Sequence, residues 1–193
     1  LIDWSYKEEL APENHVAFQL KVSSLRGGHS GMDINQGRGN ANKILARVLM
    51  ALAPAGLRLS SFDGGNLRNE IPREAKAVVL VKNEKRFAKL LQAVSKEIAV
   101  EYQTAEPNIK IEATEASKPA KVMRKSDQVK FLHAIRAVQN GVYRMSPEIP
   151  GLVEASTNLA KITLGDGKLS IGSLQRSSVE SSKADVAAAF RAP

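Results

Sequence analysis

The chain has no cysteine among its 193 residues, which excludes disulfide bonds, thiolate catalysis and zinc sites with cysteine ligands. Histidine is scarce as well, with only His15, His29 and His133. A catalytic metal centre needs several His, Asp or Glu ligands that converge on one point, and neither a His-x-Asp nor a His-Glu-x-x-His motif occurs. We therefore expect no metal and no cofactor in this chain itself.

Long apolar runs are also missing. No segment approaches the roughly 20 apolar residues that cross a bilayer, and no signal-peptide pattern opens the chain. These two absences predict a cytoplasmic protein with no membrane partner.

The charge is not balanced: 28 basic and 20 acidic residues leave a net charge of +8. Such an excess can indicate nucleic-acid binding, but here the basic residues are spread along the whole chain. Recognition of RNA by a sheet needs aromatic side chains on its central strands, and only Phe18 and Phe62 are candidates. The alternative function is a basic α/β nucleic-acid-binding module, and a third possibility is a domain that only oligomerises. The function favoured below involves no nucleic acid.

Nucleophilic catalysis is not indicated. Ser30 follows His29 directly, but adjacent residues on a turn rarely point at each other, and no Gly-x-Ser-x-Gly elbow occurs. Residues 37–43 precede a helix, as a phosphate-binding loop does, but their glycine spacing fits neither the dinucleotide fingerprint nor the P-loop. His29 lies on a turn whose glycines allow positive φ. Taken alone, such a histidine is more often a surface residue than a functional one.

Hydrophobic periodicity predicts the elements of the first two thirds. Alternation of apolar residues predicts strands over residues 16–22, 57–62, 74–81 and 109–113. Helical spacing predicts a helix that Asn40 or Asn42 could cap and another that Asn83 caps. The resulting order is β-α-β-β-α-β.

The last third is predicted as a second unit. Residues 115–125 are polar and read as a connection, after which Ser126 caps a helix that reaches about residue 138. Strands over 152–164 and 168–176 are joined by a Gly-Asp-Gly hairpin turn, and a helix runs from Val179. The fold class predicted is α+β: a mainly antiparallel sheet with helices packed on one face, a split β-α-β-β-α-β (ferredoxin-like) order and an extra α-β-β-α unit.

Five blocks of sequence, taken together, resemble the lid domain of the aminoacyl-histidine (cytosol nonspecific) dipeptidases, a family of di-zinc metallopeptidases. The blocks are Gly-Gly-His-Ser-Gly at 27–31 with the segment to residue 43, Gly-Gly-Asn-Leu-Arg-Asn-Glu-Ile-Pro-Arg-Glu at 64–74, Asn-Gly-Val-Tyr-Arg-Met-Ser at 140–146, residues 151–159, and Gln-Arg-Ser-Ser at 175–178. They fall in the family's order and span roughly residues 10–190.

The resemblance implies that residues 1–193 form a lid and dimerisation domain, with 1–15 and 177–193 as connections toward a metal-binding catalytic domain. In the family, that second domain binds two zinc ions with ligands that include a His-x-Asp motif. This chain lacks the motif, starts without Met and stops within a helical stretch, so we expect a segment of a longer dipeptidase that is inactive by itself.

The resemblance also implies roles for three residues. His29 matches the lid histidine that crosses the dimer and stabilises the tetrahedral oxyanion. Asn69 matches an asparagine that contacts substrate across the dimer, and Arg176 matches the arginine thought to bind the substrate's terminal carboxylate. The partners implied are a second copy of the chain and an Xaa-His or other dipeptide. Asn35 stands where relatives often carry His, a departure that leaves these three roles untouched.

Overall fold

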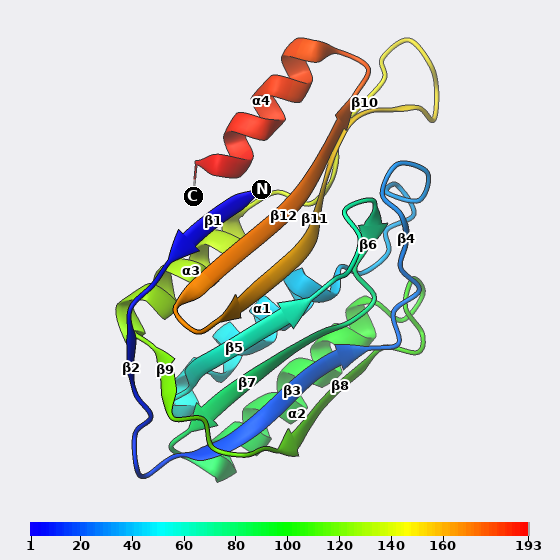
Figure 1. Cartoon of the computed structure of the whole chain (residues 1–193). Coiled ribbons are helices and arrows are strands. Elements are labelled where there is room, and N and C mark those ends of the chain that lie inside the picture. Colours follow the sequence, from blue (N-terminus) through cyan, green and yellow to red (C-terminus); the bar gives the residue numbers. More distant parts are fainter. Residues whose placement is uncertain (193) are drawn as a thin grey trace.

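The predicted β-α-β-β-α-β order is present in the computed structural model, which describes residues 1–192 (Figure 1). Its elements are β3 (Val16–Ser23), α1 (Ala41–Leu52), β5 (Arg58–Gly64), β7 (Ala75–Val81), α2 (Glu84–Glu101) and β8 (Lys110–Glu115). A turn of 3₁₀ helix (Ala53–Ala55) follows α1, and Gly56, with a φ of 74°, ends it. Every strand pair in this unit is antiparallel.

The extra α-β-β-α unit is also present. It consists of α3 (Lys125–Ala137), β11 (Val153–Gly165), β12 (Lys168–Ser177) and α4 (Glu180–Arg191). Asp166 and Gly167 turn the β11–β12 hairpin with φ values of 50° and 73°, the positive values that a type I′ turn requires. No helix among residues 1–192 is long and apolar enough to cross a membrane.

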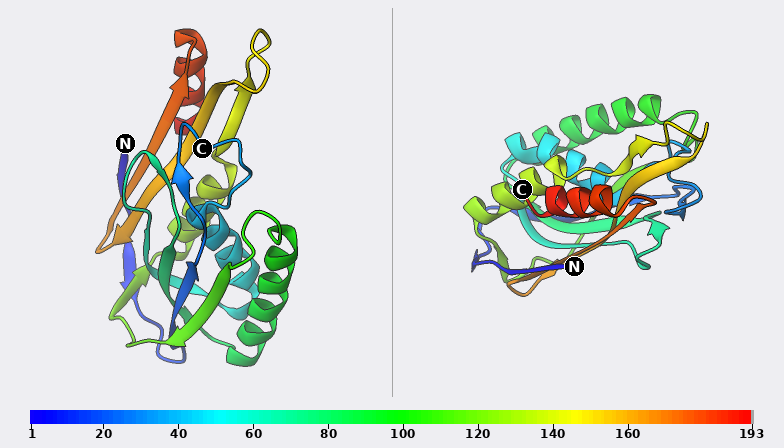
Figure 2. Two further views of the ribbon diagram at one scale, coloured as in Figure 1. Left: turned by 90° about the vertical axis from the view of Figure 1, so that its right-hand side faces the viewer. Right: turned by 90° about the horizontal axis from the view of Figure 1, so that it is seen from above.

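All main strands join one eight-stranded sheet. Its order is β1 (Ile2–Ser5), β12, β11, β5, β7, β3 and β8, and β10 (Gly141–Met145) pairs with β11 beside this path. The views in Figure 2 show α1, α2 and α3 on one face of the sheet. The predicted fold class is therefore confirmed.

The core lies between this helical layer and the sheet. Among the helices, α1 contributes the most side chains to it, because Leu45, Val48, Leu49 and Leu52 recur on one face and are all fully buried. Burying each such side chain stabilises the fold by about 1.5–3 kcal/mol. Helix α2 buries a narrower stripe and covers the sheet edge at β3 and β8.

The two aromatic residues that an RNA-binding sheet would need are used inside the fold. Phe18 stacks on Phe87 of α2, with ring centroids 4.8 Å apart. Phe62 is fully buried against Phe131 of α3. Since both rings pack against helices, neither provides a stacking surface on the open face of the sheet.

Several short elements were not predicted. They are β1, β2 (Glu8–Leu10), β4 (Gly28–His29), β6 (Glu70–Ile71), β9 (Lys121–Met123) and β10. β9 lies in the segment expected to be a plain connection and pairs with β2. The prediction that Ser126 caps α3 is wrong, because Arg124 precedes the helix and Ser126 is already inside it. Runs of two to five residues are too short for their periodicity to be read.

Strand β11 changes neighbours along its length, and asparagine side chains form hydrogen bonds with its backbone where it has neither β5 nor β10 beside it. One end of β11 pairs with β5 and the other with β10, with a register shift after Leu159. The Leu159 N–H donates to Asn140 Oδ1 at 2.8 Å. The Leu159 carbonyl accepts from Nδ2 of Asn40 at 3.1 Å and of Asn42 at 3.3 Å. Side-chain amides thus replace the missing strand ladder.

Asn40 is also the N-cap of α1, which confirms one of the two caps predicted for this helix. Its Oδ1 accepts from the backbone N–H of Asn42 at 3.0 Å and of Lys43 at 3.3 Å. Asn83 caps α2 in the same way through Arg86, but on an exposed surface. The two helices therefore offer a matched pair of caps, one buried and one exposed.

We expect Asn40→Ala to lower the free energy of unfolding by about 3 kcal/mol, because it removes a cap and leaves a buried carbonyl short of a donor. Asn83→Ala should cost only about 1 kcal/mol, the usual loss for an exposed cap. Urea denaturation followed by circular dichroism measures both. Equal losses would show that the buried contacts of Asn40 add nothing to its capping.

Candidate functional site

His29 lies on a small two-stranded ribbon that leaves the main sheet after β3, and Asn69 directly precedes the second strand of that ribbon (Figure 1). In this β4–β6 ribbon, Gly28 stands opposite Ile71 and His29 opposite Glu70. The Ser30 N–H donates to the Asn69 carbonyl at 2.8 Å. The ribbon therefore places the two residues side by side, although 40 positions separate them in the chain.

Two glycines let the ribbon backbone pass close to arginine side chains. Gly27 has a φ of 62°, and a Cβ there would lie 2.3 Å from Cγ of Arg73. Gly28 has a φ of 143°, and its Cβ would lie 2.3 Å from Nη1 of Arg38. Any side chain at either position would displace an arginine as well as strain the backbone.

The backbone around His29 fixes the state of its imidazole. Nδ1 accepts from the N–H of Gly31 at 3.2 Å and of Met32 at 3.3 Å. A ring nitrogen that accepts hydrogen bonds carries no proton, so in the neutral ring the proton is on Nε2. His29 is therefore set to act as a hydrogen-bond donor through Nε2.

Arg176 reaches the same loop from β12. A Cβ on Gly31 would lie 3.1 Å from Cε1 of His29 and 3.2 Å from Nε of Arg176, so the two side chains flank one point. Arg176 and Asn69 are exposed, and His29 is half-buried. All three residues singled out from the sequence thus gather at one end of the molecule.

A buried carboxylate closes the base of the loop that carries His29. Glu106, in the connection between α2 and β8, is only 1% exposed. Its Oε2 accepts from the N–H of Arg26 at 2.7 Å, and its Oε1 from the N–H of Gly39 at 2.9 Å. Sequence reasoning missed Glu106, because nothing in a polar connection indicates contacts with Arg26 and Gly39, which lie 80 and 67 positions earlier in the chain.

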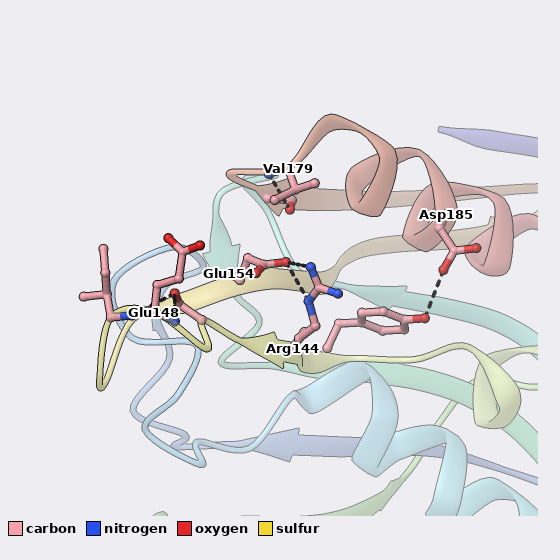
Figure 3. A network of polar contacts seen from close by, with 9 residues as sticks. Arg144, Glu148, Glu154, Val179 and Asp185 are labelled. Atoms are coloured by element: carbon pink, nitrogen blue, oxygen red, sulfur yellow. Dashed lines mark hydrogen bonds and ion pairs between the residues drawn. The ribbon is translucent and has the colours of Figure 1, made fainter.

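Beside β12, which carries Arg176, polar contacts join β10, β11 and α4 (Figure 3). Arg144 of β10 grips Oε1 of Glu154 on β11, with its Nε at 2.6 Å. Tyr143 donates to Oδ2 of Asp185 on α4 at 3.0 Å, and this hydrogen bond raises the pKa of Tyr143 above its usual value. β10 and α4 are thereby tied to each other and to the strand beside Arg176.

No metal centre forms among residues 1–192, where no three His, Cys, Asp or Glu side chains gather closely enough to hold an ion. His133 is exposed on α3 and His15 precedes β3, so neither joins His29. The adjacent Glu8 and Glu9 contact different partners, Lys121 and Arg58.

The side chains at the site offer hydrogen-bond donors and positive charge. Ser30 is only 1% exposed and is not presented as a nucleophile. Guanidinium groups of Arg38, Arg73 and Arg176 surround the ribbon, and only Arg38 is paired, with Asp33 at 3.3 Å, among the ion pairs of the described chain. This arrangement can bind a carboxylate and stabilise negative charge on a substrate oxygen.

Comparison with known proteins agrees with the early resemblance. A family model described as the peptidase dimerisation domain matches residues 20–106. The cytosol non-specific dipeptidase of Escherichia coli (strain K12) is 36% identical over 180 residues, which make up 91% of this chain and 37% of that protein. The crystal structure of the aminoacylhistidine dipeptidase from Vibrio alginolyticus matches with a TM-score of 0.94 and 35% identity, over 98% of this chain and 39% of that one. The chain thus spans about two fifths of the length of these relatives.

We expect Glu106→Ala to lower the free energy of unfolding by about 3 kcal/mol, because two backbone donors lose a charged acceptor. Glu106→Gln keeps one acceptor oxygen and should cost less. Glu97→Ala, an exposed position on α2, serves as the control. Thermal and urea unfolding measure the three variants, and a loss at Glu106 no larger than at Glu97 would contradict the anchoring role.

Proposed function

Because the chain belongs to the family of aminoacyl-histidine and cytosol non-specific dipeptidases, we propose that it is the lid and dimerisation domain of such an enzyme. The observation that carries the proposal is the gathering of His29, Asn69 and Arg176 at one end of the fold. They arrive there from β4, the β5–β6 loop and β12, so the assembly depends on the tertiary fold rather than on one local motif.

His29 serves as an oxyanion donor in this proposal. Attack on a peptide carbonyl places negative charge on its oxygen, and a donor already aimed at that position stabilises the transition state. Supporting this role, Nδ1 is used by two backbone N–H groups, which leaves Nε2–H available as a donor. A fixed tautomer needs no reorganisation during the reaction.

Arg176 and Asn69 hold the substrate. A guanidinium binds a carboxylate through two parallel hydrogen bonds, and a dipeptide carries its terminal carboxylate one residue from the scissile bond. The position of Arg176 beside His29 fits that short spacing. The exposed Asn69 amide can add a donor and an acceptor to the peptide group.

The metal chemistry belongs to another domain in this proposal. The described residues do not assemble metal ligands, so the two zinc ions of the parent dipeptidase would be held outside this chain. The parent enzyme would cleave Xaa-His or other dipeptides in the cytoplasm, and this chain alone would not turn over substrate. Zinc-dependent dipeptide hydrolysis by the isolated chain would contradict this part of the proposal.

Two copies of the chain would pair around a two-fold axis. Support comes from the match to a dimerisation domain and from the free edge of the sheet at β8, which within residues 1–192 has only β3 as a neighbour. An unpaired strand edge readily accepts another strand. Beside it, α2 presents exposed apolar side chains, among them Val100, which is 60% exposed.

We expect His29→Ala in the full-length enzyme to lower kcat about 100- to 1,000-fold, as the loss of one oxyanion donor does. Zinc content and the KM for a dipeptide should change little, because the contact forms mainly in the transition state. His133→Ala, an exposed histidine on α3, is the matched control. Steady-state kinetics and metal analysis decide the outcome, and an unchanged kcat would refute the role of His29.

We expect Val100→Asp to weaken self-association of the chain at least tenfold in Kd, which corresponds to about 1.4 kcal/mol. A carboxylate placed in the apolar part of an interface loses its hydration without gaining a partner. Val129→Asp makes the same change on α3, where Val129 is 46% exposed, and should leave the dimer intact. Sedimentation velocity compares the two, and equal dimer populations would move the interface away from α2 and β8.

A further inference from the structure

The loop that carries His29 is folded around the side chain of Asp33. Oδ2 of Asp33 accepts from the backbone N–H of His29 at 2.8 Å, and the Asp33 N–H donates back to the His29 carbonyl at 2.8 Å. One residue thus holds the backbone of His29 on both sides. The ladder between β4 and β6 has only two residue pairs, so it could not fix the loop alone.

Arg38 holds Asp33 in this position. Nη2 of Arg38 lies 3.3 Å from Oδ1 of Asp33, and Nη1 of Arg38 donates to the Gly27 carbonyl at 2.6 Å. The guanidinium therefore joins the carboxylate to the backbone at the start of β4. Gly28 leaves room for both side chains, since a Cβ there would lie 2.7 Å from Oδ2 of Asp33.

The geometry of this turn reaches the imidazole through two further donors. Gly31 and Met32 lie between His29 and Asp33, and their N–H groups point at Nδ1 of His29 only while the turn keeps its shape. If the turn opens, these donors leave Nδ1, and the ring becomes free to exchange between its two tautomers. The position of the ring proton thus depends on the contacts of Asp33.

We propose that Asp33 and Arg38 are positioning residues that fold the loop around His29 and thereby hold its imidazole as the Nε2–H donor. The effect on the His29 tautomer does not depend on the proposed function, whereas its consequence for catalysis rests on the proposed role of His29. Neither Asp33 nor Arg38 needs to touch the substrate for this purpose.

A role in global stability explains the Asp33–Arg38 ion pair less well than a positioning role does. The side chains of Arg38 and Asp33 are 26% and 29% exposed, so water partly screens their ion pair and reduces its contribution to global stability. The base of the loop is already closed by Glu106. Breaking the ion pair should therefore have a larger effect on the tautomer of His29 than on the free energy of unfolding of the protein.

The test is the ring-nitrogen chemical shifts of His29, recorded by long-range ¹H–¹⁵N NMR on the labelled chain at a pH where the ring is neutral. In the unaltered protein we expect Nδ1 at the shift of an unprotonated nitrogen and Nε2 at that of a protonated one. In Asp33→Ala the two shifts should move toward each other, because the tautomers exchange. Arg38→Gln, which leaves Asp33 in place, should give a smaller change in the same direction.

Glu9→Ala is the matched control, because it removes the ion pair with Arg58 between β2 and the start of β5, at the other end of the sheet from the ribbon (Figure 1). It should leave the His29 shifts unchanged. Should Asp33→Ala fail to fold, Arg38→Gln decides the matter by itself. Shifts in a folded variant that remain those of the unaltered protein would overturn the proposal.

Kinetics of the full-length enzyme separate this inference from the proposed function. Asp33→Ala should lower kcat about 10- to 100-fold through misplacement of the donor, with little change in KM. If His29→Ala leaves kcat unchanged, the proposed function fails while the NMR result still judges Asp33. If His29→Ala lowers kcat but Asp33→Ala alters neither kcat nor the ring shifts, only the positioning role is lost.

Discussion

The need to satisfy the backbone of β11 at Leu159 governs the arrangement of the whole site end. At this point β11 has passed its last pair with β10, at Thr157, and has not yet reached its first pair with β5, at Ile162. An unpaired carbonyl and N–H in a fully buried position would be costly. Asn40, Asn42 and Asn140 supply the missing partners, and the first of them also starts α1. The sheet can therefore divide there without exposing its core.

The β4–β6 ribbon is attached to the sheet next to the point where β11 changes neighbours. Asn158, next to Leu159, is 1% exposed and donates from Nδ2 to the Glu70 carbonyl at 2.7 Å. That bond ties β6 to β11, and β6 in turn pairs with the strand that carries His29. A chain of hydrogen bonds thus runs from the cap of α1 to the site. Rigid secondary structure thus positions His29 even though β4 itself is only two residues long.

The sequence predicted the parts of the fold that rest on long periodic patterns. Phe87, Val94 and Ile98 repeat at helical spacing and form the buried face of α2, as expected. The β4–β6 ribbon escaped prediction because two-residue strands have no period, and its stability comes from distant side chains. His29, Asn69 and Arg176 were found through a family resemblance, since a lone turn histidine or an exposed arginine carries little information. The structure then explained their grouping, and it added Asp33 and Glu106.

The two donors on Nδ1 of His29 have a consequence for selectivity among ligands. A metal ion binds a histidine through a ring lone pair, and the lone pair on Nδ1 is already engaged inside the chain. For Nε2 to bind an ion, its proton would have to move to Nδ1, where Gly31 and Met32 already point hydrogens. His29 is therefore disfavoured as a metal ligand, while its Nε2–H remains available as a hydrogen-bond donor.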